Sequence, residues 1–132
     1  MIFIDKNVWK ILSDSPTANT VKIFFYIATN QPDEGIFGYR TTKLQLEIDL
    51  NLKQAIIFRN LKWLKENLLI QELKMAEDFD FMVNPRFVMN NSDYNERFAE
   101  WNRRCNLDSA REVRLRKERR IRKLRSEKKQ KN

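Results

Sequence analysis

The sequence predicts a mainly α-helical protein with a small β-hairpin, organised as a winged helix–turn–helix domain followed by a long basic C-terminal helix. Leucine and isoleucine residues between positions 46 and 70 recur with the spacing of a short helix, a tight turn and a longer helix. Two short segments, 70–75 and 79–83, follow directly on either side of Ala76-Glu77-Asp78 and predict a hairpin. The excess of positive charge lies in residues 103–132.

The chain length is that of one domain with an extension. The 132 residues are 42% hydrophobic and 33% charged, which is a globular balance with an excess of charge. We assign residues 1–90 to the winged-helix domain and residues 91–132 to the C-terminal helix.

Several kinds of chemistry are excluded by composition. The sequence has no His, one Cys and two Gly. A catalytic His triad and a His-ligated zinc site therefore cannot form, and two glycines cannot make a Gly-rich phosphate loop. We predict a non-enzymatic protein with no catalytic residues, no metal site and no cofactor.

The same composition bears on the compartment. A single cysteine, Cys105, cannot form an internal disulfide and suits a reducing environment. The longest apolar run, Ile23 to Ala28, has six residues, whereas a bilayer span needs roughly 20. The N-terminus lacks the pattern of a signal peptide. We expect a cytoplasmic protein that does not contact a membrane.

Two helices and a short strand are expected before the helix–turn–helix. Asp5 should cap a first short helix. Ser15 and Pro16 should cap and begin a second helix, and a strand should cover residues 36–39. The second helix should bury one stripe of apolar side chains: Ala18, Val21, Phe25 and Ala28.

The helix–turn–helix is expected between residues 42 and 67. Thr41 or Thr42 should cap its first helix, and Asn51 should adopt the left-handed conformation that a tight turn needs. A helix over residues 53–67 is then the recognition helix, whose first turns enter the major groove of DNA.

The hairpin that follows is a poor DNA-binding element. Its tip carries Glu77, Asp78 and Asp80, three carboxylates that would repel phosphate. We therefore expect this wing to stay out of the minor groove and to be available for a basic partner, including the tail of a second copy.

One segment after the hairpin resembles a motif of a known family. It reads Phe81-Met82-Val83-Asn84-Pro85-Arg86-Phe87-Val88. Following a helix–turn–helix and a hairpin, it resembles the RepL-like plasmid replication proteins, which have an aromatic-x-V/I-N-P box at this place. The resemblance covers about residues 1–90 and implies sequence-specific DNA binding and initiation of plasmid replication. Within the box, Asn84 and Pro85 are expected to end the last strand and turn the chain rather than to contact DNA.

The predicted DNA contacts lie on the recognition helix, on its neighbours and on the tail. Residues Lys53, Gln54, Arg59 and Asn60 are the candidates for base contacts. In the domain, Arg40, Lys43, Lys62 and Lys65 are the candidates for backbone contacts. In the tail, the backbone candidates are Arg103, Arg104, Arg111, Arg114, Arg116, Lys117, Arg119, Arg120, Arg122, Lys123 and Arg125.

The C-terminal helix changes character along its length. Asp93 and Glu96 have the spacing of a capping box, and Tyr94, Phe98, Trp101 and Cys105 form a stripe that should dock on the core. Residues 103–132 hold 14 basic and 4 acidic side chains. Residues 1–102 hold 12 basic and 14 acidic side chains. The apolar stripe of this last part is thin, so we expect fraying from about residue 110 without a partner.

Three functions fit these observations. The first is a plasmid or phage replication initiator that binds origin DNA and recruits host replication proteins. The second is a winged-helix transcriptional regulator, such as a copy-control repressor, which would use the same residues. The third is an RNA- or polyanion-binding structural protein that depends on the Arg-rich tail. In the first two, the partner is double-stranded DNA, and a homodimer is compatible with each.

Overall fold

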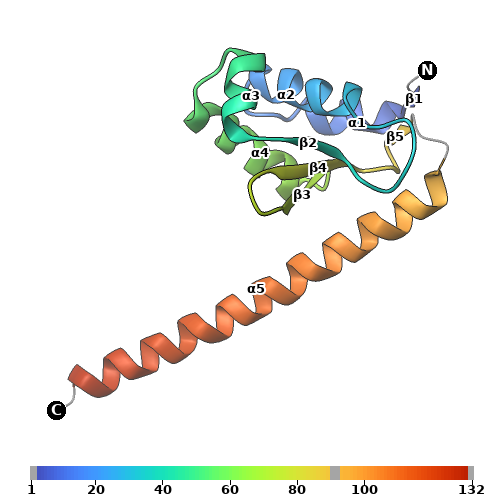
Figure 1. The fold of residues 1–132 in the computed structure, drawn as a ribbon. Coiled ribbons are helices and arrows are strands. Elements are labelled where there is room, and N and C mark those ends of the chain that lie inside the picture. The colour runs from blue at the N-terminus through green and yellow to red at the C-terminus, as the bar shows by residue number, and fades with distance from the viewer. Residues whose placement is uncertain (1–2, 90–92, 131–132) are drawn as a thin grey trace. The chain divides into compact units, whose positions relative to one another are not determined.

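The computed structural model describes residues 3–89 and 93–130. It contains five helices within these residues and two small antiparallel sheets, one of two strands and one of three (Figure 1). The chain divides into two compact units, Met1–Trp101 and Asn102–Asn132. The first unit is a winged helix–turn–helix, which confirms the predicted fold class.

The first helix, α1 (Lys6–Leu12), begins as the sequence predicts. The Asp5 carboxylate accepts a hydrogen bond of 2.7 Å from the backbone N–H of Asn7. A short strand that was not predicted, β1 (Phe3–Ile4), precedes it and pairs antiparallel with β5 (Val88–Met89). This pairing joins the start of the chain to the end of the winged helix.

The second helix, α2 (Ala18–Thr29), begins two residues later than predicted and buries a different face. Thr17 is its N-cap residue, so the Ser15–Pro16 prediction is wrong. Of the expected stripe, Ala18 is exposed, whereas Val21 and Phe25 are only half-buried. Because the run from Ile23 to Ala28 is apolar on every side, only the neighbouring elements decide which face is covered. The residues of α2 that are buried are Thr20, Ile23, Phe24, Ile27 and Ala28.

The helix–turn–helix forms as predicted. Thr42 caps α3 (Lys43–Leu50), its hydroxyl accepting a 3.0 Å hydrogen bond from the N–H of Gln45. Asn51 follows in the left-handed conformation, with φ 53° and ψ 48°. The recognition helix α4 (Gln54–Glu66) then begins after Lys53, its N-cap residue.

The sheet has the strand order β2-β4-β3 and is antiparallel throughout. The strands β3 (Ile70–Lys74) and β4 (Phe79–Val83) form the predicted hairpin. The strand before α3 is β2 (Tyr39–Thr41), three residues further along than predicted. A Cβ atom on Gly38 would lie 2.3 Å from the carbonyl oxygen of Phe81, so only glycine allows this approach to β4.

The turn after β4 has the structural role that the sequence predicts for Asn84 and Pro85. The strand ends at Val83, immediately before these two residues. The Asn84 side-chain amide donates to the carbonyl of Leu68 at 2.9 Å, and its side-chain oxygen accepts from the N–H of Arg86 at 3.0 Å. Asn84 therefore ties the end of β4 to the segment before β3.

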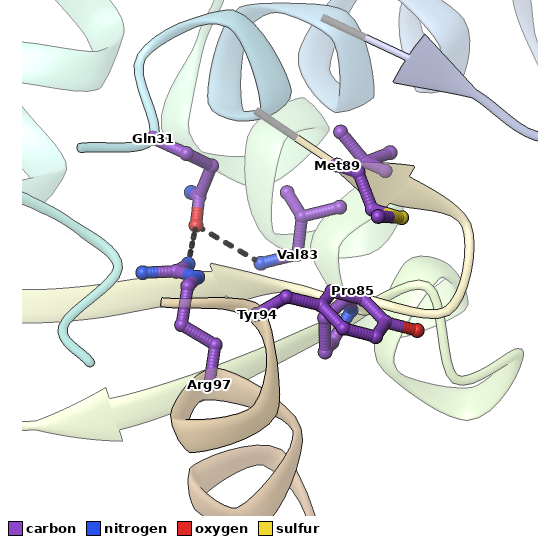
Figure 2. Close-up of a pocket in the computed structure, with 7 residues that line it drawn as sticks. Gln31, Val83, Pro85, Met89, Tyr94 and Arg97 are labelled. Atoms are coloured by element: carbon purple, nitrogen blue, oxygen red, sulfur yellow. Dashed lines mark hydrogen bonds between the residues drawn. The ribbon is translucent and has the colours of Figure 1, made fainter. Parts of the chain in front are cut away.

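A buried polar cluster that the sequence does not reveal fixes the first turns of the last helix, α5 (Tyr94–Gln130). The Arg97 guanidinium is 4% exposed and donates to the carbonyls of Gly35 and Phe37 and to the side-chain oxygen of Gln31. Gln31 in turn donates to the carbonyl of Phe81 at 2.8 Å. Its side-chain oxygen accepts from both Arg97 and the N–H of Val83 (Figure 2). The cavity beside this cluster measures about 10 Å³, which is room for no more than a water molecule.

The second unit consists of the remainder of α5. The helix continues to Gln130, beyond the residue at which we expected fraying. Residues 102–130 contain no Gly or Pro and are rich in Arg, Lys, Glu and Leu, which have high helix propensity. Its large apolar side chains Leu107, Val113, Ile121 and Leu124 are between 49% and 59% exposed. Within the described residues, no helix has a segment suited to crossing a membrane.

Candidate nucleic-acid interface

The recognition helix α4 has one face in the core and one face open to solvent. Ile57, Leu61 and Leu64 are at most 4% exposed and belong to the core of the winged helix. On the other side, at helical spacing, lie the exposed residues Ala55, Arg59, Lys62 and Glu66. This face is basic at its centre, where Arg59 and Lys62 lie, and carries Glu66 at its end.

Three of the four candidates for base contacts lie at the solvent-exposed start of α4. Lys53 and Arg59 are exposed, and neither has a salt bridge among the described residues. Gln54 is also exposed, but its side-chain amide donates to the Glu47 carboxylate at 2.8 Å. Gln54 would have to leave Glu47 before it could bind an adenine edge.

The prediction is wrong for the fourth candidate, Asn60. It is 2% exposed, and its side-chain oxygen accepts hydrogen bonds from the hydroxyls of Thr17 and Thr20. Its amide nitrogen donates to the carbonyl of Ile56 at 2.8 Å. Asn60 joins α4 to the start of α2 and cannot reach a base, because the side chain lies on the buried face of α4.

The candidates for backbone contacts in the domain differ in whether the charged group already contacts a carboxylate or an aromatic ring. Arg40 lies 3.1 Å from Asp78 and Lys65 lies 2.8 Å from Glu72, so both are ion-paired. The ammonium of Lys43 lies over the rings of Phe58 and Phe79, at 4.3 and 4.7 Å from their centroids. Lys62 is exposed and has no such partner among the described side chains.

The wing carries fewer free carboxylates than the sequence suggests. Glu77 is exposed, whereas Asp78 is paired with Arg40. Asp80 is completely buried and accepts a 2.8 Å hydrogen bond from the N–H of Gly38. The prediction of three carboxylates at the tip is therefore wrong for Asp80, which points inward from β4.

The position of α3 is fixed by polar contacts with α2. Lys22 donates to the carbonyl of Leu50 at 2.8 Å, and the Tyr26 hydroxyl donates to the Asp49 carboxylate at 2.5 Å. Partial burial, followed by the hydrogen bonds to Asp49 and Tyr39, raises the pKa of the Tyr26 phenol far above its usual value. Tyr26 therefore stays a donor to Asp49 throughout the physiological pH range.

The tail presents its cations around the whole circumference of α5. Arg104 is the exception, because its side chain is only 2% exposed. At 100° per residue the other tail candidates cover all sides of the helix, so about half of them can face one duplex. The exposed candidates are Arg103, Arg111, Arg114, Arg116, Lys117, Arg119, Arg120, Arg122, Lys123 and Arg125.

Comparison with known proteins adds little to this geometry. No protein-family model matches the chain, and no curated protein matches it. Among solved structures, HlyU from Vibrio cholerae N16961 is similar at a TM-score of 0.42 and 17% sequence identity, over 75% of this chain and 91% of that one.

Proposed function

We propose that this protein is a non-enzymatic, sequence-specific double-stranded DNA-binding protein that acts as a transcriptional regulator. The observation that carries the proposal is the exposed face of α4. It presents Arg59 and Lys62 to solvent on a helix held by a continuous core, directly after a helix–turn–helix turn. A helix of this kind fits the major groove of B-DNA, where all four base pairs are distinguishable.

The base contacts in this proposal come from the first turns of α4. Arg59 can donate two hydrogen bonds to guanine, and Gln54, once released from Glu47, can pair with adenine. Lys53 precedes the helix and can contact either a base or a phosphate. Lys62 lies one turn beyond Arg59 and serves the backbone. Asn60 has no place in this set because it is buried.

The tail supplies affinity rather than sequence information. Its exposed arginines and lysines neutralise phosphates and release counterions, which strengthens binding to any duplex. The domain, whose cations are partly ion-paired, supplies discrimination.

A regulator is the simplest role for this set of features, since occupying a site on DNA is sufficient for it. A second candidate function, initiation of plasmid replication, is favoured by the resemblance of residues 81–88 to the RepL-like box. An initiator would also have to recruit host replication proteins. Replication of a test plasmid that carries this gene and its flanking DNA, with the gene intact or interrupted, separates the two roles.

The proposal is tested by selecting bound sites from random duplexes and measuring affinity for the selected and scrambled sites. We expect Arg59→Ala to lower the ratio of specific to non-specific affinity by about 10- to 100-fold, the worth of one bidentate contact. Lys62→Ala, on the same face one turn later, is the matched control. It should weaken binding to both duplexes equally. If Arg59→Ala leaves the ratio unchanged, α4 is not the reading helix.

A further inference from the structure

The cations of the tail form two separate faces on α5. At about 100° per residue, one set of Lys and Arg side chains has the spacing i, i+3, i+4, i+7 of a single helix face, and the centre of a second set lies about 150° away from it. We call these sets the first and the second basic face. The first basic face consists of Arg116, Arg119, Arg120 and Lys123. The second basic face consists of Arg114, Lys117, Arg125 and Lys128.

Both basic faces are available to an external polyanion. Every side chain in them is exposed, and none has a salt bridge with another described residue. Glu112 and Glu127 lie at the two ends of the first face and Glu118 lies at the edge of the second, so cations remain in excess on both. At 1.5 Å per residue the faces extend over about 10 Å and about 21 Å of helix, lengths over which a duplex presents several phosphates.

The residues between the two faces argue against a helix that lies in the groove of one duplex. On the shorter arc between the faces lie Val113 and Leu124, which are 53% and 59% exposed. Turned into a groove, these side chains would remove water from the base edges without offering a hydrogen-bond partner. On the longer arc each face lies about 105° from the side that would enter the groove, so its cations would point away from the duplex. Each basic face is therefore suited to the phosphates of a different duplex.

We propose that α5 bridges two DNA duplexes, with one duplex on each basic face. This inference rests on the DNA binding proposed above and adds a second duplex to it. A duplex that lies against one face leaves the opposite face exposed, and the cations there attract further phosphates. The helix, about 10–12 Å across with its side chains, keeps the two duplexes apart and places positive charge between them, which offsets their repulsion. Because the contacts are to phosphate, bridging does not depend on DNA sequence.

The test measures binding to one duplex and bridging of two duplexes by the full-length protein. For bridging, beads carry one short random-sequence duplex, a second duplex with a fluorescent label is in solution, and the label captured on the beads is measured. For binding to one duplex, fluorescence anisotropy gives the affinity at a series of salt concentrations. We expect the unchanged protein to capture the labelled duplex at low salt and to release it as the salt concentration rises.

Three variants with the same loss of charge distinguish bridging from binding to one duplex. Two face variants replace all four cations of one basic face with Gln, which keeps a high helix propensity. Each should capture at least about tenfold less labelled duplex, because one face has lost its phosphate contacts. Each should bind one duplex with an unchanged salt slope, because the other face is intact.

The matched control takes the same number of cations from both faces. It is Arg114→Gln/Arg116→Gln/Lys117→Gln/Arg119→Gln, which leaves two cations on each face. Its salt slope for one duplex should be flatter by about 2 units, since each neutralised phosphate contributes about 0.9.

Three outcomes would overturn the proposal. Bridging by either face variant at the level of the unchanged protein would assign the bridge to other surfaces of the protein. Equal flattening of the slope by all three variants would show that both faces contact a single duplex. Failure of the unchanged protein to bind any duplex would overturn the proposed function together with this inference, whereas binding without bridging would overturn this inference alone.

Discussion

The two units of the chain are ordered by different forces. In Met1–Trp101, side chains such as Phe24, Leu46 and Phe81 are completely buried in a core to which helices and strands contribute. In Asn102–Asn132, the large apolar side chains described are about half exposed or more, apart from the half-buried Leu115. The winged helix is therefore held by tertiary packing, whereas the helix of the tail depends on helix propensity.

The two units also differ in net charge. The first 102 residues carry a net charge of −2 and the last 30 carry +10. In the domain, Arg40 and Lys65 have fixed carboxylate partners. In the tail, cations outnumber anions more than threefold, so most of them need an external counterion. In the proposed function, the domain supplies discrimination because discrimination needs side chains held in place, and the tail supplies affinity because binding a polyanion needs only charge density.

The largest expected effect comes from removing the tail charge. Replacing the nine Lys and Arg residues between positions 111 and 125 with Gln should flatten the dependence of log affinity on log salt by about 4 units. The reason is that about half of the cations face one duplex, and each neutralised phosphate contributes about 0.9. Salt titrations on cognate and scrambled duplexes measure this slope.

The control for this experiment replaces the tail carboxylates Glu112, Glu118 and Glu127 with Gln, which keeps every cation. Its slope should be at least as steep as that of the unchanged protein. Equal slopes for the unchanged protein and the variant without these nine cations would show that this part of the tail does not touch DNA, and would favour a protein or RNA partner for it.

A smaller effect is expected from the core. Phe24→Ala should lower the free energy of unfolding by about 3–5 kcal/mol, because Phe24 is completely buried and its removal leaves a cavity. Leu107→Ala, in the tail and 50% exposed, should change it by less than about 0.5 kcal/mol. Denaturant titrations of both variants compare the two units directly. A similar loss from both would mean that the tail shares in the cooperative core.

The smallest effect concerns the turn between α3 and α4. Asn51→Ala should lower the free energy of unfolding by about 1 kcal/mol, because alanine tolerates a φ of 53° less well than asparagine. Asn51→Gly should be close to neutral, since glycine adopts this conformation without strain. Thermal or denaturant unfolding measures both. An Asn51→Ala variant as stable as the unchanged protein would show that the turn relaxes out of the left-handed region.

Local signals in the sequence predict the elements that depend on neighbouring residues. Asp5 and Thr42 cap their helices as expected, since a cap needs only an oxygen within three residues of its donor. Asn51 marks the turn for a similarly local reason. The hairpin and the strand-ending role of Asn84 also follow from short-range patterns.

Predictions from the sequence are wrong where the burial of a side chain depends on residues distant in the sequence. The buried face of α2 could not be predicted, because Ile23–Ala28 is apolar all round and the elements packed against it make the selection. The burial of Asp80 has no local signature, because the N–H that donates to it belongs to Gly38, 42 positions away. The contact of Arg97 with Gln31 spans 66 positions and has no local signature.

The sequence by itself determined the class of the fold, the helix–turn–helix, the hairpin and the separation of charge between domain and tail. Each of these is encoded in spacing or in composition, which are properties of the chain before it folds. Helical spacing places Asn60, three residues after Ile57 and four before Leu64, on the buried side of α4. Tertiary structure alone decided which groups satisfy its amide there. Asn60 and Arg59 are adjacent, polar and equally able to bind a base, yet the hydroxyls of Thr17 and Thr20 hold Asn60 in the core and Arg59 is left exposed. A buried amide must find partners when it loses water, and those partners come from another helix.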